Sequence, residues 1–547
     1  MFMQRLFTGL LPVLLCLSLA LGGCAGKGAP FGQAQAPEGG LDLVILHAND
    51  MHSFIAGTDK SGQACMKEDG CYGGYARVAQ AIKDAKAKGD NVIALDAGDQ
   101  MQGTMLYTVF KMSLMADIYP LIPFDAATLG NHEFDEGCAK LADYLSGVRI
   151  PMLAANLDPA KGCPMLGAKF QPWVIREIRG VKVGIVGIAC DDVIEPGKAC
   201  VKTRFKDVKA TLEAAVKELK SQGVGIVIAL THIGLGADRE LARAVDGVDV
   251  IVGGHSHSYI GSSPDEKAEG PYPIVERSPS GRPVLVVTAK KSAKYLGELE
   301  VQFDRDGVPV GWRGQPRLLD PACPRDAKVS AVVASYAQKG EAYRKAVIGV
   351  NEIDMPDGME ACRAGECLSA SVAVDAFLDW GSRYGAEMAL ITGGALRNPL
   401  PRGQVSRGDI LAIAPFPNTL LVKEFTGEQL LAALEHGVQD DNHDGAYIVH
   451  PAGFTYEADM ARPSGQRIVK AESTGRKGRE RIDPKRRYKV CLTSYLAGGG
   501  DRYEMLKEGR VLPAPSAGDG EVIEAYVKKA SPIRTRRGGR FVLKNAK

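Results

Sequence analysis

Short, continuously apolar runs alternate with amphipathic helical patterns from residue 41 to about residue 300. The runs are LDLVIL, NVIAL, AATL, VKVGIVGI, GIVIAL and VDVIV. The helical patterns include GYARVAQAIKDAKAKG and DVKATLEAAVKELKSQG, and both end in Gly, as helices often do. Because strands that are apolar on both sides are buried on both faces, we predict an α/β fold in which helices cover the sheets.

The chain is too long for a single hydrophobic core, since it has 547 residues. The breaker cluster DPACPRD begins near residue 320, and a helical pattern, AKVSAVVASYAQKGEAYRKAV, follows it. We therefore predict a first domain over 41–318, a connector helix over 319–346 and a smaller α/β domain over 347–547. The last domain contains the helical patterns SASVAVDAFLDWGSRYG and GEQLLAALEHGV and the strand patterns TLLVKEF and YKVCLTS.

The N-terminus has the pattern of a signal peptide. Arg5 precedes the apolar stretch LFTGLLPVLLCLSLALGG. A transmembrane anchor is the alternative, but Pro12 and the glycines before Cys24 disfavour it. The sequence LGGC resembles the lipobox of bacterial lipoproteins, which implies a signal peptide over 1–23 and a lipid on Cys24. Residues 24–40 then form a flexible tether, and we expect an exported bacterial lipoprotein, periplasmic or at the cell surface.

The overall charge gives no case for a nucleic acid polymer as a partner. The chain has 67 Lys and Arg against 65 Asp and Glu, a net charge of +2. We therefore expect it to meet a membrane only through the lipid, and its oligomeric state stays open.

Twelve cysteines occur, and ten remain once Cys16 and Cys24 of the N-terminal segment are set aside. An exported compartment permits disulfides. The pairs close enough to form local loops are Cys65 with Cys71, Cys190 with Cys200, and Cys362 with Cys367. A metal cluster is the alternative, but it is disfavoured because no CxxC spacing occurs.

Metal-ligating side chains directly follow five of the apolar runs. They are Asp50 and His52 after LVILHA, Asp99 after NVIALDA, Asn131 and His132 after AATLG, His232 after GIVIALT, and His255 and His257 after VDVIVGG. A single histidine at a strand end is more often structural than a ligand, and His47, inside its strand, is predicted to be a core residue. Five such strand endings together favour a shared site, because sites form beyond the carboxyl ends of strands in covered sheets and the five endings can meet there.

The types of residue indicate two metal ions rather than one. Asp, Asn and His suit hard to borderline divalent metals. Seven donors are too many for one tetrahedral ion: Asp50, His52, Asp99, Asn131, His232, His255 and His257. Two ions about 3.5–4 Å apart that share a carboxylate would use them all, and such a pair activates water and holds the oxygens of a phosphoryl group.

Five motifs, in this order, resemble the metallophosphoesterase domain of the 5'-nucleotidase family: LHANDMHS, DAGDQMQG, LGNHEFDEG, ALTHIG and GGHSH. The resemblance implies a four-layer domain with two covered mixed sheets. It also implies two divalent ions (Zn, Mn or Co), one held by Asp50, His52, Asp99 and His257, and the other by Asp99, Asn131, His232 and His255. Asp99 would bridge the two ions. His257 is a departure, since many members have Gln or Asn there.

The motif TLGNHEFDEG also contains the residues that we expect to be catalytic. His132 would face the substrate and stabilise charge on the phosphoryl group or the leaving oxygen. Asp135 would orient that imidazole and fix its tautomer. For Glu133, a helix-start carboxylate is the favoured interpretation over a catalytic one.

The C-terminal half offers residues for a nucleotide. Arg363 lies in CRAGEC, Arg397 in TGGALRNPLPRG, Phe416 in APFPN, and Tyr495 and Asp501 in SYLAGGGDRYEML. Taken singly, each could be a core aromatic or a solvated charge. The resemblance implies that the two arginines bind phosphate, that Phe416 and Tyr495 stack on the base, and that Asp501 binds the ribose.

Two departures and two cysteine spacings complete the comparison with the family. Tyr495 stands where Phe is frequent, and Thr392 where Asn is common. The Cys65–Cys71 and Cys362–Cys367 spacings resemble disulfides of animal members.

We therefore expect a dimetal hydrolase that removes the 5'-phosphate from nucleotides, most of all nucleoside monophosphates, for salvage outside the cytoplasm. The alternatives on the same fold are a nucleotide-sugar pyrophosphatase or a 2',3'-cyclic-nucleotide phosphodiesterase. An alternative of another class is a non-catalytic surface protein that binds nucleotides.

Overall fold

The computed structural model describes residues 40–190, 203–355, 359–414, 418–440, 442, 445–475, 478–515, 517–536 and 538–546. The signal peptide, Cys24, most of the tether, Cys200 and Phe416 lie outside these ranges. In the described part, no helix has both the length and the apolar character needed to cross a membrane.

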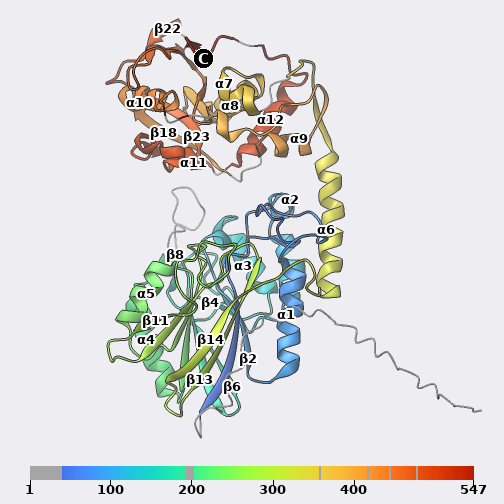
Figure 1. Cartoon of the computed structure of the whole chain (residues 1–547), viewed down its shortest axis with the longest axis vertical. Coiled ribbons are helices and arrows are strands. Elements are labelled where there is room, and N and C mark those ends of the chain that lie inside the picture. The colour runs from blue at the N-terminus through green and yellow to red at the C-terminus, as the bar shows by residue number, and fades with distance from the viewer. Residues whose placement is uncertain are drawn as a thin grey trace, which may run out of the picture.

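Two six-stranded mixed sheets form the N-terminal domain (Figure 1). The first has the order β14-β13-β1-β2-β3-β4, with strands β1 (Leu41–Ala48), β2 (Val92–Asp96), β3 (Ala126–Thr128), β4 (Met152–Leu153), β13 (Tyr295–Phe303) and β14 (Pro309–Leu318). The second has the order β11-β12-β10-β9-β7-β6, with strands β6 (Trp173–Ile178), β7 (Val181–Ile188), β9 (Ile226–Thr231), β10 (Val250–Gly253), β11 (Ile274–Arg277) and β12 (Pro283–Val287). In the first sheet β1, β2, β3 and β4 are parallel, and antiparallel pairing occurs only at the side of β13 and β14. In the second sheet the central strands are parallel and both edge strands pair antiparallel.

The continuous apolar strands are buried because both of their faces are covered. One core fills the space between the sheets, with Ile45, Leu95, Ile185 and Ile228 among its residues. Outside the first sheet lie α1 (Tyr75–Lys88), α2 (Met105–Ile118) and α3 (Cys138–Gly147), and outside the second lie α4 (Val208–Ser221) and α5 (Leu235–Ala244). The predicted four-layer arrangement is thus confirmed.

The connector is a helix, α6 (Ala327–Lys345), that packs against α1 and α2 and reaches the C-terminal domain (Figure 1). It begins later than residue 319, because DPACPRD forms a turn in which Cys323 N–H donates to Asp320 O. Asp326 then caps the helix, since its side chain accepts from Val329 N–H at 3.0 Å.

A five-stranded mixed sheet, order β19-β16-β23-β18-β24, is central to the C-terminal domain. Its strands are β16 (Met388–Thr392), β18 (Leu420–Thr426), β19 (Val449–Ala452), β23 (Arg487–Thr493) and β24 (Arg510–Leu512). On one face lie α8 (Leu368–Ser382), α9 (Arg407–Ile413) and α12 (Asp519–Ala530). On the other lie α10 (Gly427–Gly437), α11 (Ser494–Ala497) and a four-stranded sheet of β20 (Phe454–Asp459), β21 (Ile468–Gly475), β22 (Gly478–Arg481) and β25 (Phe541–Lys544).

Shorter elements complete the described chain. They are β5 (Leu157–Pro159) with β8 (Thr203–Phe205), β15 (Val347–Asn351) with β17 (Gly403–Ser406), α7 (Met359–Ala364), and the 3-10 turns η1 (Tyr119–Leu121), η2 (His132–Phe134), η3 (Gly393–Ala395), η4 (Gly500–Arg502) and η5 (Glu504–Leu506).

Two of the three local cysteine pairs are disulfides in the structure, Cys65 with Cys71 and Cys362 with Cys367. The third involves Cys200, which lies outside the described residues. His47 is a core residue, as predicted: it is fully buried and its Nε2 lies 2.7 Å from Tyr272 Oη.

Candidate active site

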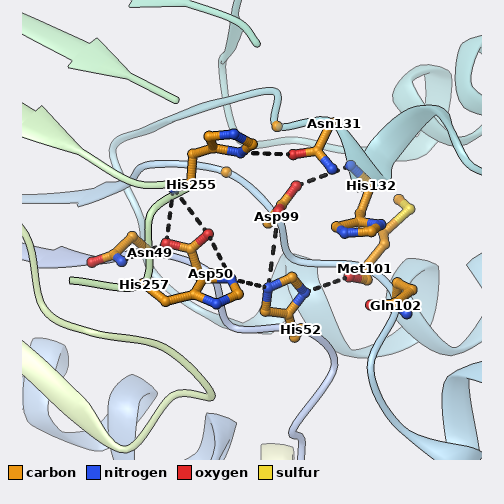
Figure 2. A network of polar contacts seen from close by, with 12 residues as sticks. Asn49, Asp50, His52, Asp99, Met101, Gln102, Asn131, His132, His255 and His257 are labelled. Carbon is orange, nitrogen blue, oxygen red and sulfur yellow. Dashed lines mark hydrogen bonds and ion pairs between the residues drawn. The ribbon is translucent and has the colours of Figure 1, made fainter. Parts of the chain in front are cut away.

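The loops after five strands of the two sheets meet, and all seven predicted ligands come together there. Figure 2 labels all of them except His232. The structure arranges most of them in two groups. Asp50, His52 and His257 form one group, and Asp99, His232 and His255 form the other; in each, ligand atoms lie within 4.8 Å of one another. The remaining ligand, Asn131, joins the second group, because its Oδ1 lies 3.1 Å from His255 Nδ1.

The two carboxylates lie at the centre of this arrangement. Asp50 Oδ1 lies 3.5 Å from His257 Nε2 and 3.8 Å from His232 Nε2. Asp99 Oδ2 lies 3.2 Å from His232 Nε2 and 3.9 Å from His52 Nε2. Each carboxylate therefore lies within 4 Å of imidazoles from both groups, as expected of a site in which two cations lie close together.

The imidazoles are held so that their Nε2 atoms point inward. His232 Nδ1 lies 2.6 Å from Ala97 O and His52 Nδ1 lies 3.3 Å from Met101 O, so each Nδ1 donates to a backbone carbonyl. This hydrogen bond leaves the Nε2 lone pair for a metal. The buried Nε2 of His232 has no hydrogen-bond partner in the described chain, and His52 Nε2 and His257 Nε2 face each other at 2.9 Å. These donors fit divalent cations.

The electrostatics of the site also favour cations. Burial lowers the pKa of His52 to about 4 and that of His257 to about 3, so both imidazoles are neutral and can act as ligands. Burial, with the charge of Asp99 in addition, raises the pKa of Asp50 to about 6. Two buried carboxylates this close repel each other, and positive charge between them would remove the repulsion.

The ligand loops adopt a backbone conformation that L-residues rarely adopt. The φ angles are 49° at Asp50, 47° at His52, 55° at Asp99, 78° at His255 and 55° at His257. Such left-handed conformations are costly and concentrate at functional sites, where the surroundings enforce them.

Glu133 enforces part of this geometry, which the sequence did not indicate. It stands in the first turn of η2, the position of a helix-start carboxylate, and it is fully buried. Its carboxylate accepts from the N–H of Gly130 at 2.6 Å, Asp99 at 3.0 Å and Gln100 at 2.9 Å. It therefore ties the loop after β3 to the loop after β2. Burial raises its pKa to about 7.

His132 and Asp135 form a pair at the edge of the metal site. His132 Nδ1 lies 2.7 Å from Asp135 Oδ2, and the His132 N–H donates to Asp99 Oδ1 at 3.0 Å. Burial lowers the pKa of His132, but the hydrogen bond to Asp135 and the charge of Asp99 outweigh it and raise the pKa above its ordinary value. The imidazole can therefore carry a proton beside a reacting phosphate.

Tyr495 and Asp501 contact each other in the C-terminal domain. Tyr495 is 52% exposed on α11, and its hydroxyl donates to Asp501 Oδ1 at 2.7 Å. In Figure 1, α11 lies on the side of this domain that faces the N-terminal domain. An exposed ring beside a carboxylate is suited to a nucleoside.

The two predicted arginines, Arg363 and Arg397, both lie close to the turn η3 of the C-terminal domain. Arg363 is in α7, which packs against η3, and Arg397 follows η3. Arg397 Nη1 donates to the carbonyls of Gly394 and Leu396, so its head group is held by its own turn. The N–H of Gly394 donates to Ala446 O. The residue after Ala446 is Tyr447, and its carbonyl accepts from the hydroxyl of Tyr503. The segment around residue 446 thus links the arginine turn to the turn that follows Asp501.

Comparisons with known proteins agree with this fold and site. Residues 43–259 match the family model for the calcineurin-like phosphoesterase, and residues 347–508 match that for the 5'-nucleotidase, C-terminal domain. The 5'-nucleotidase of Bos taurus is 32% identical over 91% of this chain and 90% of its own. The solved 5'-nucleotidase precursor of Thermus thermophilus is 33% identical, with a TM-score of 0.62 over 93% of this chain and 100% of its own. The NAD nucleotidase of Haemophilus influenzae is 25% identical, with a TM-score of 0.71 over 92% of this chain and 99% of its own.

The fold and the loop-borne ligands define a metallophosphoesterase, whose fold implies divalent metal ions. The chain belongs to the 5'-nucleotidase family. It is a phosphoric monoester hydrolase that acts on nucleotides, so the alternative of a non-catalytic binding protein is not supported.

Proposed function

We propose that this enzyme removes the 5'-phosphate from nucleoside monophosphates with the help of two divalent ions. Asp50, His52, Asp99 and His257 would hold one ion, and Asp99, Asn131, His232 and His255 the other. The observation that supports this best is that two buried carboxylates, those of Asp50 and Asp99, each lie within 4 Å of imidazoles from both ligand groups. When bound, such ions polarise the phosphoryl oxygens and activate water near neutral pH.

The protein's own part in the reaction falls to His132 and Asp135. His132 would donate a hydrogen bond to the phosphoryl group or to the leaving 5'-oxygen as negative charge develops there. Asp135 keeps the proton of the imidazole on Nδ1 when the ring is neutral and stabilises the ring when it is charged. Donors aimed at developing charge lower the barrier more than they strengthen binding of the ground state.

Substrate choice would come from the C-terminal domain, over 347–547. Arg363 and Arg397 would bind phosphate, Phe416 and Tyr495 would stack on the base, and Asp501 would accept from the ribose hydroxyls. The exposed ring of Tyr495, beside the Asp501 carboxylate, supports this role. The catalytic domain would span 41–318, with 319–346 as the connector.

The N-terminal sequence supports an exported lipoprotein. Cleavage before Cys24 and lipidation of its thiol would leave the enzyme on a membrane through residues 24–40. Nucleotides outside the cytoplasm would then be its substrates. Labelling with a radioactive fatty acid tests this location: Cys24→Ala should abolish the label, and a label that persists would contradict the anchor.

A substrate panel with metal analysis on the same preparation tests the proposed activity. With Mn²⁺ or Zn²⁺ added, we expect phosphate release from AMP at a higher kcat/KM than turnover of UDP-glucose, 2',3'-cyclic AMP or NAD. NAD belongs in the panel because the protein resembles a NAD nucleotidase in fold. A clear preference for any of the other three would replace nucleoside monophosphates as the proposed substrate.

A further inference from the structure

A lysine lies in the core of the C-terminal domain. Lys423, on the interior strand β18, is 3% exposed. Its Nζ donates to Ala497 O at 3.1 Å, Leu506 O at 2.6 Å and Lys507 O at 3.0 Å. These three bonds use every donor of the ammonium group.

A lysine at this position is costly unless it has a specific task. Its side chain lies on the same face of β18 as the buried Phe425, with Nζ 5.6 Å from that ring. A buried charge is unfavourable unless it is paired and hydrogen-bonded. Among the described residues no carboxylate pairs with Lys423, and burial lowers its pKa. Only the three carbonyl dipoles compensate the charge, so their positions and that of the lysine are tightly linked.

Those carbonyls lie on either side of Asp501 along the chain, and the first of them, that of Ala497, follows Tyr495 by two residues. Ala497 ends α11, which carries Tyr495, while Leu506 and Lys507 lie just beyond Asp501. Asp501 has a left-handed backbone, with φ 53°, and its carbonyl accepts from His436 Nε2 at 2.8 Å. Further along, Tyr503 is fully buried and its hydroxyl donates to Tyr447 O. Lys423 therefore closes the base of a turn whose tip is exposed.

We propose that Lys423 is a positioning residue for nucleoside binding, which sets the distance between the Tyr495 ring and the Asp501 carboxylate from beneath. It touches no substrate and acts only through the backbone of 497–507. This inference rests on the proposed roles of Tyr495 and Asp501.

The test compares three variants of the full-length enzyme. Lys423→Met keeps the length of the side chain but leaves three carbonyls unpaired. Val422→Ala is the matched control, because Val422 is also buried on the same strand but packs in the core on the opposite face. Tyr495→Ala reports on the nucleoside site itself. For each, KM and kcat for AMP, competitive inhibition by adenosine, and kcat/KM for p-nitrophenyl phosphate are measured at saturating Mn²⁺.

We expect Lys423→Met to raise the KM for AMP and the inhibition constant of adenosine by about tenfold, the scale of a lost base–aromatic stack. Its kcat/KM on p-nitrophenyl phosphate should stay within about twofold of wild type, and Val422→Ala should shift neither substrate selectively. If Lys423→Met does not fold, Lys423→Gln, which keeps two donors, is used instead. It should likewise raise the KM for AMP and the inhibition constant of adenosine while leaving kcat/KM for p-nitrophenyl phosphate almost unchanged.

Two results would overturn the inference in different ways. If Tyr495→Ala weakens adenosine inhibition but the Lys423 variants behave like Val422→Ala, Lys423 is only structural. If Tyr495→Ala itself leaves adenosine inhibition unchanged, the proposed nucleoside site is wrong, and the inference about Lys423 fails with it.

Discussion

At the scale of single residues, the predicted metal ligands and the predicted catalytic pair occupy neighbouring positions. Asp50, His52, Asp99 and His232 lie buried at the ends of strands, while Asn131, His255 and His257 are half-buried. His132 stands beside them, about a quarter exposed, with its Nδ1 2.7 Å from Asp135 Oδ2, and it is not one of the seven predicted ligands. Its loss should affect the chemical step and leave the metals in place.

His132→Asn should therefore lower kcat for AMP by about 10²- to 10⁴-fold, the usual range for acid–base assistance. Metal content, measured on the same sample by mass spectrometry, should equal that of wild type. An unchanged kcat would show that the imidazole takes no part in the reaction.

Tyr495→Ala should weaken AMP turnover selectively, because one stack on a base contributes about 1–3 kcal/mol. The expected loss in kcat/KM is about 5- to 100-fold for AMP and less than about twofold for p-nitrophenyl phosphate. Equal losses on the two substrates would mean that the ring has a structural role.

At the scale of elements, the loops after β2 and β3 act as one unit. Glu133 accepts from backbone N–H groups of both loops. The two loops pass so close to each other that a side chain at Gly130 cannot fit between them. A Cβ added to Gly130 would lie 2.2 Å from Asp99 Oδ1. The position of the Asp99 carboxylate thus depends on residues outside the set of predicted ligands.

Glu133→Gln replaces one acceptor oxygen with an NH₂ group that faces backbone N–H donors. We expect metal affinity to fall about 10- to 100-fold, as happens when partners that orient ligands are lost, measured by competition with a chromogenic chelator. Glu136→Gln is the control, since Glu136 forms ion pairs with Lys111 and Lys140 outside the metal site. Equal affinities in the two variants would contradict the role of Glu133.

Gly130→Ala should abolish activity with AMP and reduce bound metal, because the new methyl group would displace Asp99. Gly147→Ala at the end of α3 is the matched control: a Cβ there meets nothing within 4 Å. An active Gly130→Ala enzyme with full metal content would show that the loops can separate without harm.

The sequence predicted that the seven candidate ligands would meet, because their signal is local: a polar residue that follows a buried strand in a covered sheet lies at a predictable edge. It also predicted the four layers, and the strands LDLVIL and GIVIAL became β1 and β9. It did not reveal the role of Glu133, because two of its partners, Asp99 and Gln100, lie more than 30 residues away. The left-handed backbone of Asp50 and His255 was not visible either, since only the surrounding fold imposes it.

At the scale of the whole molecule, one domain holds the metal site and the other holds the residues proposed to bind the nucleoside. The helix α6 joins them (Figure 1). Metal binding and nucleoside binding should therefore affect catalysis separately. Substitutions of the proposed nucleoside-binding residues should change substrate preference, and substitutions of the predicted metal ligands should abolish turnover of every substrate.

The most direct measurement is the number of metal ions bound per chain, followed by titration of AMP hydrolysis with metal into the chelated enzyme. We predict two ions in the wild type, activity that returns only as both bind, and no activity in a folded Asp99→Asn variant, which loses the shared charge. A folded wild-type enzyme that hydrolyses AMP fully with one ion or none, or an active Asp99→Asn variant that still holds two, would contradict the binuclear centre.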